Sequence, residues 1–253
     1  MFERLGKRRF AALFRGQLQR QAAQINLVSV MALFGQNSSE LEQSMRMLKY
    51  SILSIFAALL SVCACAETKV AESADEISPL LIGQFVPQVT VKTEFGGDIE
   101  LMALIEKRPT VIIFYRGGWC PYCSRQMAGL VEVEQRILDL GYQILAISPD
   151  SPARLTAQRS SQDFEIIHLS DMSLAATVGF GLAYYVDDEM VETIRGQLGA
   201  EVVTLEDESK VVLPVPAAYI IDTTGLVKFA YVNPNFQQRI NPNLLYQAAR
   251  LSR

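Results

Sequence analysis

Two cysteines separated by two residues, Cys120 and Cys123 in the run Cys-Pro-Tyr-Cys, are the residues of this sequence best suited to chemistry. The run follows an apolar, β-branched segment, 110–115, that is typical of a buried strand, and Pro121 can open a helix at its first position. Unpaired N–H groups at a helix N-terminus favour a thiolate over a thiol, so Cys120 is the natural nucleophile. One turn later, Cys123 lies on the same helix face. The pattern predicts a redox-active pair in which Cys123 is the resolving thiol.

The residues around the pair are expected to support its chemistry. Arg116 and Arg125 flank the cysteines, and their positive charges would stabilise a thiolate. Trp119, directly before Cys120, is expected to pack beside the pair or to shape the surface that a partner meets. We therefore regard Arg116, Trp119 and Pro121 as supporting residues of the site.

A permanent disulfide and half of a zinc site are the structural alternatives for such a pair. A structural zinc ion needs a second pair of ligands, and the other cysteines, Cys63 and Cys65, fall in a segment expected to be removed. The only histidine, His168, lies in a strand-like segment where a buried structural role is the better interpretation. We expect no metal ion, and no cofactor other than a redox-active Cys120–Cys123 disulfide.

Strand-like and helix-like segments alternate from residue 80 onward, which predicts an α/β fold with a central mixed β-sheet flanked by helices. A glycine pair at 96–97 predicts a hairpin turn between the first two strands. Continuous apolar runs predict strands that are buried on both faces. The expected strands are 85–93, 98–101, 110–115, 142–147, 164–169, 217–222 and 226–231, and the expected helices are 101–107, 121–141, 153–160, 171–178, 190–198 and 243–251, with a loop over 201–210.

The composition describes a folded, mildly acidic protein. The 253 residues are 50% hydrophobic and 20% charged, with a formal net charge of -4. This balance argues against disorder and gives no electrostatic support for binding nucleic acid. The charge is uneven, because residues 1–49 hold eight Lys and Arg against three Glu, a net charge of +5, which leaves -9 on the rest of the chain.

An uncharged apolar segment, 50–66, follows the basic leader and ends in Ala-Cys-Ala. It is short for a membrane span and is typical of a secretory signal peptide that is cleaved after Ala66. Cleavage would release a flexible linker, 67–79, and a single domain, 80–253. We therefore expect an exported protein, in the periplasm or at the extracytoplasmic face of the membrane.

The position of this segment, far from the first residue, calls for an explanation. Translation from Met45 or Met47 would give a signal peptide of ordinary length, so we expect that residues 1–44 are not made. An uncleaved signal anchor and a lipid anchor on Cys65 are the alternatives. All three place the acidic part of the chain outside the cytoplasm.

Four ordered blocks resemble the AhpC/TSA (peroxiredoxin-like) family of the thioredoxin-like superfamily. They are FYRGGWCPYC at 114–123, LAISPDSP at 145–152, LSDMSLAATVGFGLAY at 169–184 and LPVPAAYIIDTTGLVKFAYVNPNF at 213–236. The resemblance covers about residues 80–251 and implies a thioredoxin-like fold with an N-terminal hairpin extension. In that superfamily a cis-proline loop lies against the cysteines and receives the substrate backbone, and Val215–Pro216 matches its position.

The resemblance leaves open which sulfur attacks. Peroxiredoxins carry P-x-x-x-T-x-x-C, in which the cysteine attacks the peroxide. In this chain that cysteine is Cys123, with Cys120 in place of the threonine and Arg116 in place of the proline. Pro216 stands where the family has an arginine, just before the hairpin strand. Comparison with thioredoxin instead makes Cys120 the attacking residue.

The implied function is a thiol-dependent peroxidase that reduces hydroperoxides through a Cys120–Cys123 disulfide and is restored by a thioredoxin-like or other dithiol reductant. An extracytoplasmic thiol–disulfide oxidoreductase acting on protein disulfides is the alternative. A copper(I) carrier, suited to two thiolates, is the non-enzymatic interpretation. We expect no nucleic-acid partner, and membrane contact only through the signal or a lipid anchor.

Overall fold

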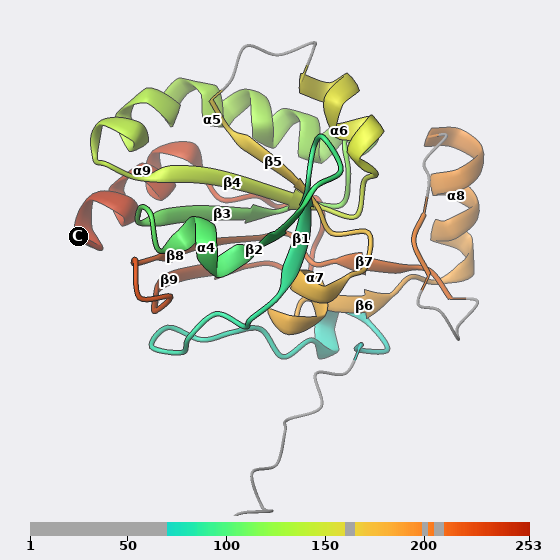
Figure 1. Cartoon of the computed structure of the whole chain (residues 1–253). Helices are drawn as coiled ribbons and strands as arrows, with labels where there is room; N and C mark the ends of the chain where they lie inside the picture. Colours follow the sequence, from blue (N-terminus) through green and yellow to red (C-terminus); the bar gives the residue numbers. More distant parts are fainter. Residues whose placement is uncertain (1–69, 160–164, 199–201, 205–209) are drawn as a thin grey trace, which may run out of the picture. The chain divides into compact units, whose positions relative to one another are not determined.

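A computed structural model describes residues 70–159, 165–198, 202–204 and 210–253, all within the compact unit Glu67–Arg253 (Figure 1). The predicted leader and signal segment lie outside the described residues, as does most of the predicted loop 201–210. Among the helices that are described, none combines the length and the apolar character needed to cross a membrane.

A seven-stranded mixed β-sheet forms the centre of the domain, in the order β2-β1-β5-β4-β3-β8-β9. β3, β4 and β5 run parallel, whereas β8 is antiparallel to both of its neighbours, and the β1–β2 hairpin joins the β5 edge antiparallel. This topology confirms the predicted α/β fold and its N-terminal hairpin. The strands are β1 (Thr90–Thr93), β2 (Asp98–Glu100), β3 (Thr110–Phe114), β4 (Gln143–Ser148), β5 (Ile167–Ser170), β8 (Ala217–Ile221) and β9 (Val227–Val232).

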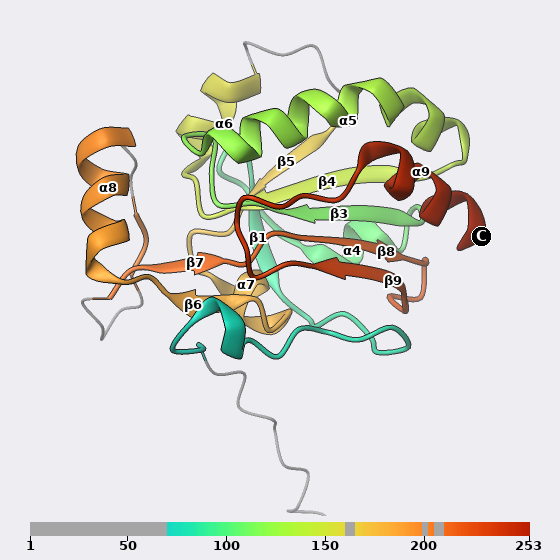
Figure 2. The same cartoon turned by 180° about the vertical axis from the view of Figure 1, so that it is seen from behind.

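Helices cover both faces of the sheet, so the domain has two buried cores (Figures 1 and 2). Successive side chains of β3 point to opposite faces. Val111 and Ile113 pack with α5 and α9, whereas Ile112 and Phe114 pack with α4 and α7. The helices are α4 (Leu101–Ile105), α5 (Pro121–Asp139), α6 (Pro152–Arg159), α7 (Ala175–Gly179) and α9 (Pro242–Leu251).

A smaller two-stranded sheet, β6 (Ala183–Tyr185) and β7 (Val212–Pro214), lies outside the central sheet, next to α8 (Asp188–Leu198) and the short 3-10 helix η1 (Ala74–Glu76) (Figure 1). β6 and β7 were not predicted, because three residues are too few to show a strand period. Backbone hydrogen bonds of 3.0 and 2.9 Å join Ala71 to the two ends of β6. Ala71, which lies in the predicted linker 67–79, is therefore hydrogen-bonded to this smaller sheet.

The Val215–Pro216 peptide bond is trans, and no cis bond occurs in the part of the chain that is described, so the predicted cis-proline is wrong. The trans bond carries the chain directly from β7 into β8. The Val215 N–H donates to the Leu182 carbonyl at 2.9 Å, and the Pro216 carbonyl accepts the Asn233 N–H at 3.2 Å. These two backbone groups are engaged within the domain and are not free to pair with a substrate backbone.

Candidate active site

Cys120 is the N-cap residue of α5 and Pro121 is its first helical residue, as predicted. The Cys120 backbone is extended (φ -85°, ψ 117°), and its carbonyl accepts the N–H groups of Cys123 and Ser124 at 2.9 and 3.0 Å. An N–H group at the first helical position would have no partner within the helix, and the exposed Pro121 has none. Both cysteines therefore lie at the positive end of a 19-residue helix, where a thiolate is favoured.

A glycine turn joins β3 to α5 and fixes the direction of the cysteine pair. Gly117 has a φ of +139°, and a side chain there would overlap the Trp119 ring and come within 2.9 Å of Asp150 Oδ1. The Gly118 N–H donates to Asp150 Oδ2 at 2.7 Å, and Gln158 Nε2 donates to the same oxygen at 2.8 Å. Asp150 therefore braces this loop.

Both cysteines are reduced and buried, with 2% of Cys120 and 1% of Cys123 exposed. A hydrogen bond from the Cys123 thiol, together with the Cys123 N–H and the positive charges of Arg116 and Arg239, lowers the pKa of Cys120 from 9.0 to about 6 against the effect of burial. The same hydrogen bond, together with burial, raises the pKa of Cys123. At neutral pH the pair therefore holds one proton and one negative charge, with the charge on Cys120.

Arg116 is buried beside the pair, with 2% of its surface exposed. Its Nε and Nη2 atoms have no hydrogen-bond partner among the described residues. The guanidinium carbon lies 4.4 Å from the centre of the Phe236 ring and 5.3 Å from that of Trp119. A buried guanidinium with unused N–H groups can stabilise negative charge that develops next to it.

Arg239 is a second guanidinium at the pair, and it was not predicted from the sequence. Its Nη2 lies 3.4 Å from Cys123 Sγ, while Nη1 donates to the carbonyls of Phe236 and Gln238. Its buried Nε has no hydrogen-bond partner within the described ranges. Arg239 comes from the loop between β9 and α9, 116 residues after Cys123, so no local motif marks it. Its only signal in the sequence is a positive charge shortly before the last helix.

Trp119 and Arg125 differ in how close they lie to the pair. Trp119 packs against the core cluster that contains both cysteines, as predicted, and also against a second apolar cluster built on β7 and α8. Arg125 is exposed on α5 and lies 5.6 Å over the Tyr122 ring. The structure thus brings Arg116 and Arg239 to the thiols, and turns Arg125 towards the surface.

The remaining predicted residues have structural positions. Val215 and Pro216 are buried directly before β8, at the sheet end where β3 leads to the cysteines. His168 is buried with its Nδ1 3.4 Å from the Tyr115 hydroxyl, in line with the structural role predicted for it. Asp171 accepts the first N–H groups of α7. Within the described ranges, no three His, Cys, Asp or Glu side chains gather as a metal site.

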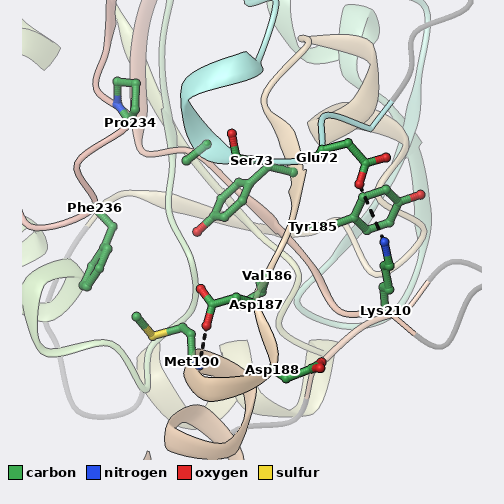
Figure 3. Close-up of a pocket in the computed structure, with 12 residues that line it drawn as sticks. Glu72, Ser73, Tyr185, Val186, Asp187, Asp188, Met190, Lys210, Pro234 and Phe236 are labelled. Carbon is green, nitrogen blue, oxygen red and sulfur yellow. Dashed lines mark hydrogen bonds and ion pairs between the residues drawn. The ribbon is translucent and has the colours of Figure 1, made fainter.

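A pocket of about 480 Å³ lies beside the cysteine site, between η1, β6, the start of α8 and the loop after β9 (Figure 3). Phe236, whose ring packs on Arg116, forms part of its wall and faces the pocket from the side opposite Tyr185 (Figure 3). The lining includes the aromatic residues Tyr184, Tyr185 and Phe236, the carboxylates of Glu72, Asp187 and Asp188, and Lys210.

Comparisons with known proteins point to one family. A model of the AhpC/TSA family matches residues 82–230. The chain is 27% identical over 145 residues to a Mycobacterium tuberculosis protein named as a peroxiredoxin, and the match covers 57% of this chain and 88% of that protein. It is 29% identical over 100 residues to a peroxiredoxin of Schizosaccharomyces pombe, and this match covers 40% of this chain and 50% of that protein. A reduced peroxiredoxin structure from Vibrio vulnificus superimposes with a TM-score of 0.55 at 18% identity, covering 68% of this chain and 99% of that one. A peroxidoxin from Mycobacterium tuberculosis gives 0.53 at 16% identity, covering 68% and 97%. Both structures share the fold of this chain.

Proposed function

The chain belongs to the AhpC/TSA family and is a thiol-based oxidoreductase of the peroxiredoxin type, and from this premise we propose that it reduces hydroperoxides through Cys120 and Cys123. The observation that carries the proposal is the charge arrangement, in which the positive charge of Arg116, whose buried N–H groups are unused, acts on a buried Cys120 thiolate. A thiolate is the form of cysteine that peroxides oxidise. The neighbouring guanidinium is suited to stabilise charge on the departing oxygen.

In the first step, the Cys120 thiolate attacks the terminal oxygen of the hydroperoxide ROOH. The O–O bond breaks, the hydroxyl group passes to the sulfur, and the sulfur loses two electrons and becomes a sulfenic acid. The other product is the alkoxide RO⁻, which takes up a proton and leaves as the alcohol. Arg116 is the group that can hold this oxygen while it carries negative charge.

In the second step, the Cys123 sulfur attacks the sulfenic sulfur of Cys120. The S–S bond forms, and the sulfenic hydroxyl leaves as water with the proton of the Cys123 thiol. Arg239 supports this step, because its charge and its hydrogen bond to Sγ lower the pKa of Cys123 against the effect of burial. An external dithiol then reduces the disulfide and is itself oxidised to a disulfide.

A thiol–disulfide oxidoreductase acting on proteins is the second candidate, and the Cys-x-x-C pair itself favours it. Two observations weigh against it. Both cysteines are almost fully buried, and the Val215 N–H is already hydrogen-bonded to the Leu182 carbonyl. A protein disulfide would therefore have to reach the sulfurs without a hydrogen bond from the Val215 backbone N–H.

Rapid mixing of the reduced full chain with hydrogen peroxide tests the proposal, with the fluorescence of Trp119, the only tryptophan, as the signal. We expect both thiols to be lost far faster than free cysteine reacts. Cys120→Ser should lose the rapid step, and Cys123→Ser should stop at the sulfenic acid. A rate close to that of free cysteine, combined with fast reduction of a protein disulfide, would favour the second candidate. Purified protein that retains copper and lacks thiol activity would favour the carrier.

Export of the domain is a separate part of the proposal. It is supported by the uncharged segment 50–66 and its Ala-Cys-Ala ending, which are typical of a cleaved signal peptide. Mass spectrometry of the native protein should find an N-terminus at Glu67 and no peptides from residues 1–44. Recovery of peptides from residues 1–20 would contradict the proposed start, and recovery of a lipid on Cys65 would replace cleavage after Ala66 with lipidation.

A further inference from the structure

We propose that the pocket beside the cysteines binds the organic group of the hydroperoxide, and that its carboxylates select neutral or cationic organic groups against anionic ones. This inference rests on the proposed peroxidase function and adds to it a substrate class. Hydrogen peroxide, which has no organic group, would react without the pocket.

The wall of the pocket contacts residues that surround the reacting sulfur. Phe236 lines it and packs on the Arg116 guanidinium at 4.4 Å. Tyr184 also lines it and packs in the same apolar cluster as Trp119, the residue directly before Cys120. Burial raises the pKa of Tyr184, and the charges of Arg116 and Cys120 act on it as well, which is consistent with this short separation. A molecule held in the pocket is therefore next to the groups that carry the chemistry.

The size and the wall of the pocket fit a compact organic group. Its volume of about 480 Å³ is within the range of small-molecule sites, roughly 300–1,000 Å³. Tyr184, Tyr185 and Phe236 offer aromatic surface, and Met190 adds a flexible apolar side chain. Such a wall favours an apolar or aromatic group over water.

The charges of the pocket are unbalanced. Three carboxylates, of Glu72, Asp187 and Asp188, face a single ammonium group, that of Lys210, which gives a formal charge of -2. Lys210 Nζ already lies 3.6 Å from Glu72 Oε2, so no cation of the lining offsets the two aspartates. A carboxylate on the ligand would be repelled by them, whereas a neutral or cationic group would not.

A matched pair of hydroperoxides tests this selection in the full chain. Cumene hydroperoxide is aromatic and neutral, and its para-carboxylate has the same body with one negative charge. We expect kcat/KM for the para-carboxylate to be roughly fivefold to tenfold lower than for cumene hydroperoxide. The double variant Asp187→Asn/Asp188→Asn should remove most of this difference, because asparagine keeps the ability of Asp187 to accept the Met190 N–H at the start of α8.

A second pair of variants tests whether the pocket is used at all. Ala74→Phe on η1 places a ring in the pocket, and Glu76→Phe places the same ring on the same short helix outside the lining. We expect the ratio of kcat/KM for cumene hydroperoxide to kcat/KM for hydrogen peroxide to fall about tenfold in Ala74→Phe. The ratio should be unchanged in Glu76→Phe.

The outcomes separate this inference from the function on which it rests. Equal rates for the two aromatic hydroperoxides, or an unchanged ratio in Ala74→Phe, would overturn the pocket proposal while rapid oxidation by hydrogen peroxide upheld the peroxidase. Slow oxidation by hydrogen peroxide but fast oxidation by cumene hydroperoxide would support both. Oxidation by all three peroxides no faster than that of free cysteine would overturn both.

Discussion

Two arginines from different parts of the chain approach the cysteine pair. Arg116 stands four residues before Cys120, and the charges of both arginines lower the pKa of Cys120. Arg239 arrives from the loop before α9 and is also hydrogen-bonded to Cys123 Sγ at 3.4 Å. Because of this hydrogen bond, the loss of Arg239 should affect the step that uses Cys123 more than the attack on peroxide. The chain lacks an arginine before β8, where Pro216 stands, and Arg239 brings a positive charge to the site from another element.

Replacing Arg239 with glutamine should slow the formation of the disulfide more than the attack on peroxide. The variant removes a charged donor from Cys123, a loss worth about 1.5–3 kcal/mol for a hydrogen bond of this kind. We expect disulfide formation to slow about tenfold or more and the sulfenic acid to accumulate. Trapping with dimedone during rapid mixing with hydrogen peroxide measures that intermediate.

Arg125→Gln is the matched control, because it removes the same charge from the same region while Arg125 lies exposed over the Tyr122 ring. The rates of peroxide attack and of disulfide formation in this variant should be close to those of the unmodified chain. Arg239→Lys keeps a charge but not the planar guanidinium with its several donors. Its rate of disulfide formation should lie between those of Arg239→Gln and Arg125→Gln. Equal slowing by Arg125→Gln and Arg239→Gln would show that only the overall charge matters.

The rate of peroxide attack should rise with pH around 6 and level off above about 7.5. The rate rises with pH because the pKa of Cys120 is about 6, so that the reactive thiolate becomes the main form only above that pH. The Cys123 hydrogen bond is the main cause of the low pKa, so in Cys123→Ala the rise should move towards the ordinary cysteine value of 9.0. Rapid-mixing rates from pH 4.5 to 9.5 measure both profiles. A rise near pH 9 in the unmodified chain would contradict the assignment of the charge to Cys120.

Among the elements, the short turn between β3 and α5 has a strict backbone requirement at Gly117. Gly117→Ala should lower the free energy of unfolding by about 1–3 kcal/mol, because φ is +139° and the added carbon overlaps the Trp119 ring. Gly96→Ala is the control, since its φ is +87° but nothing lies within 4 Å of the added carbon. Denaturant unfolding measures both variants. Only Gly117→Ala should also slow oxidation by peroxide, because it displaces the turn that carries Cys120.

The elements that carry the cysteines could be predicted because their patterns are long and regular. β3 is a continuous β-branched and aromatic run, and α5 has 19 residues with apolar positions at helical spacing after Pro121. The hairpin β8–β9 and the last helix were predicted within two residues of their observed ends, because a glycine turn and Pro242 mark them. In such segments the local pattern and the tertiary fold require the same structure.

The features that could not be predicted from the sequence depend on contacts between residues far apart in the chain. β6 and β7 have three residues each; they pair with one another, and β6 also pairs with Ala71. Arg239 reaches Cys123 only after β9 and the following loop have folded back over α5. The cis geometry expected at Val215–Pro216 came from the resemblance alone. The hydrogen bonds of these two residues to Leu182 and Asn233, which accompany the trans form, have no local pattern.

At the scale of the whole molecule, the reduced protein keeps a negative charge in its interior. Cys120 is 2% exposed and belongs to the apolar core between the sheet, α5 and α9. Burial by itself would raise the pKa of a thiol there, so the hydrogen bond from Cys123 and the two guanidinium groups more than offset it. The folded protein therefore binds the thiolate form of Cys120 more strongly than the unfolded chain does, and folding is linked to pH.

This linkage predicts how the stability of the reduced protein depends on pH. The folded pKa of Cys120, about 6, lies below the value of 9.0 taken for the unfolded chain. Between these values the unfolded chain binds one more proton at this site, so the free energy of unfolding should rise with pH across the window from 6 to 9, and the gain should be lost as pH falls through 6. Asp171, whose pKa burial raises from 3.8 to about 6, acts below this window. Denaturant unfolding under reducing conditions at pH 6, 7, 8 and 9 measures the effect relative to Cys120→Ser, in which the contributions of groups that do not interact with Cys120 cancel. The oxidised chain has no thiol at this position, so its free energy of unfolding should show the same pH dependence as that of Cys120→Ser. A difference in the free energy of unfolding between the reduced chain and the variant that stays constant from pH 6 to 9 would mean that Cys120 is a neutral thiol in the folded protein.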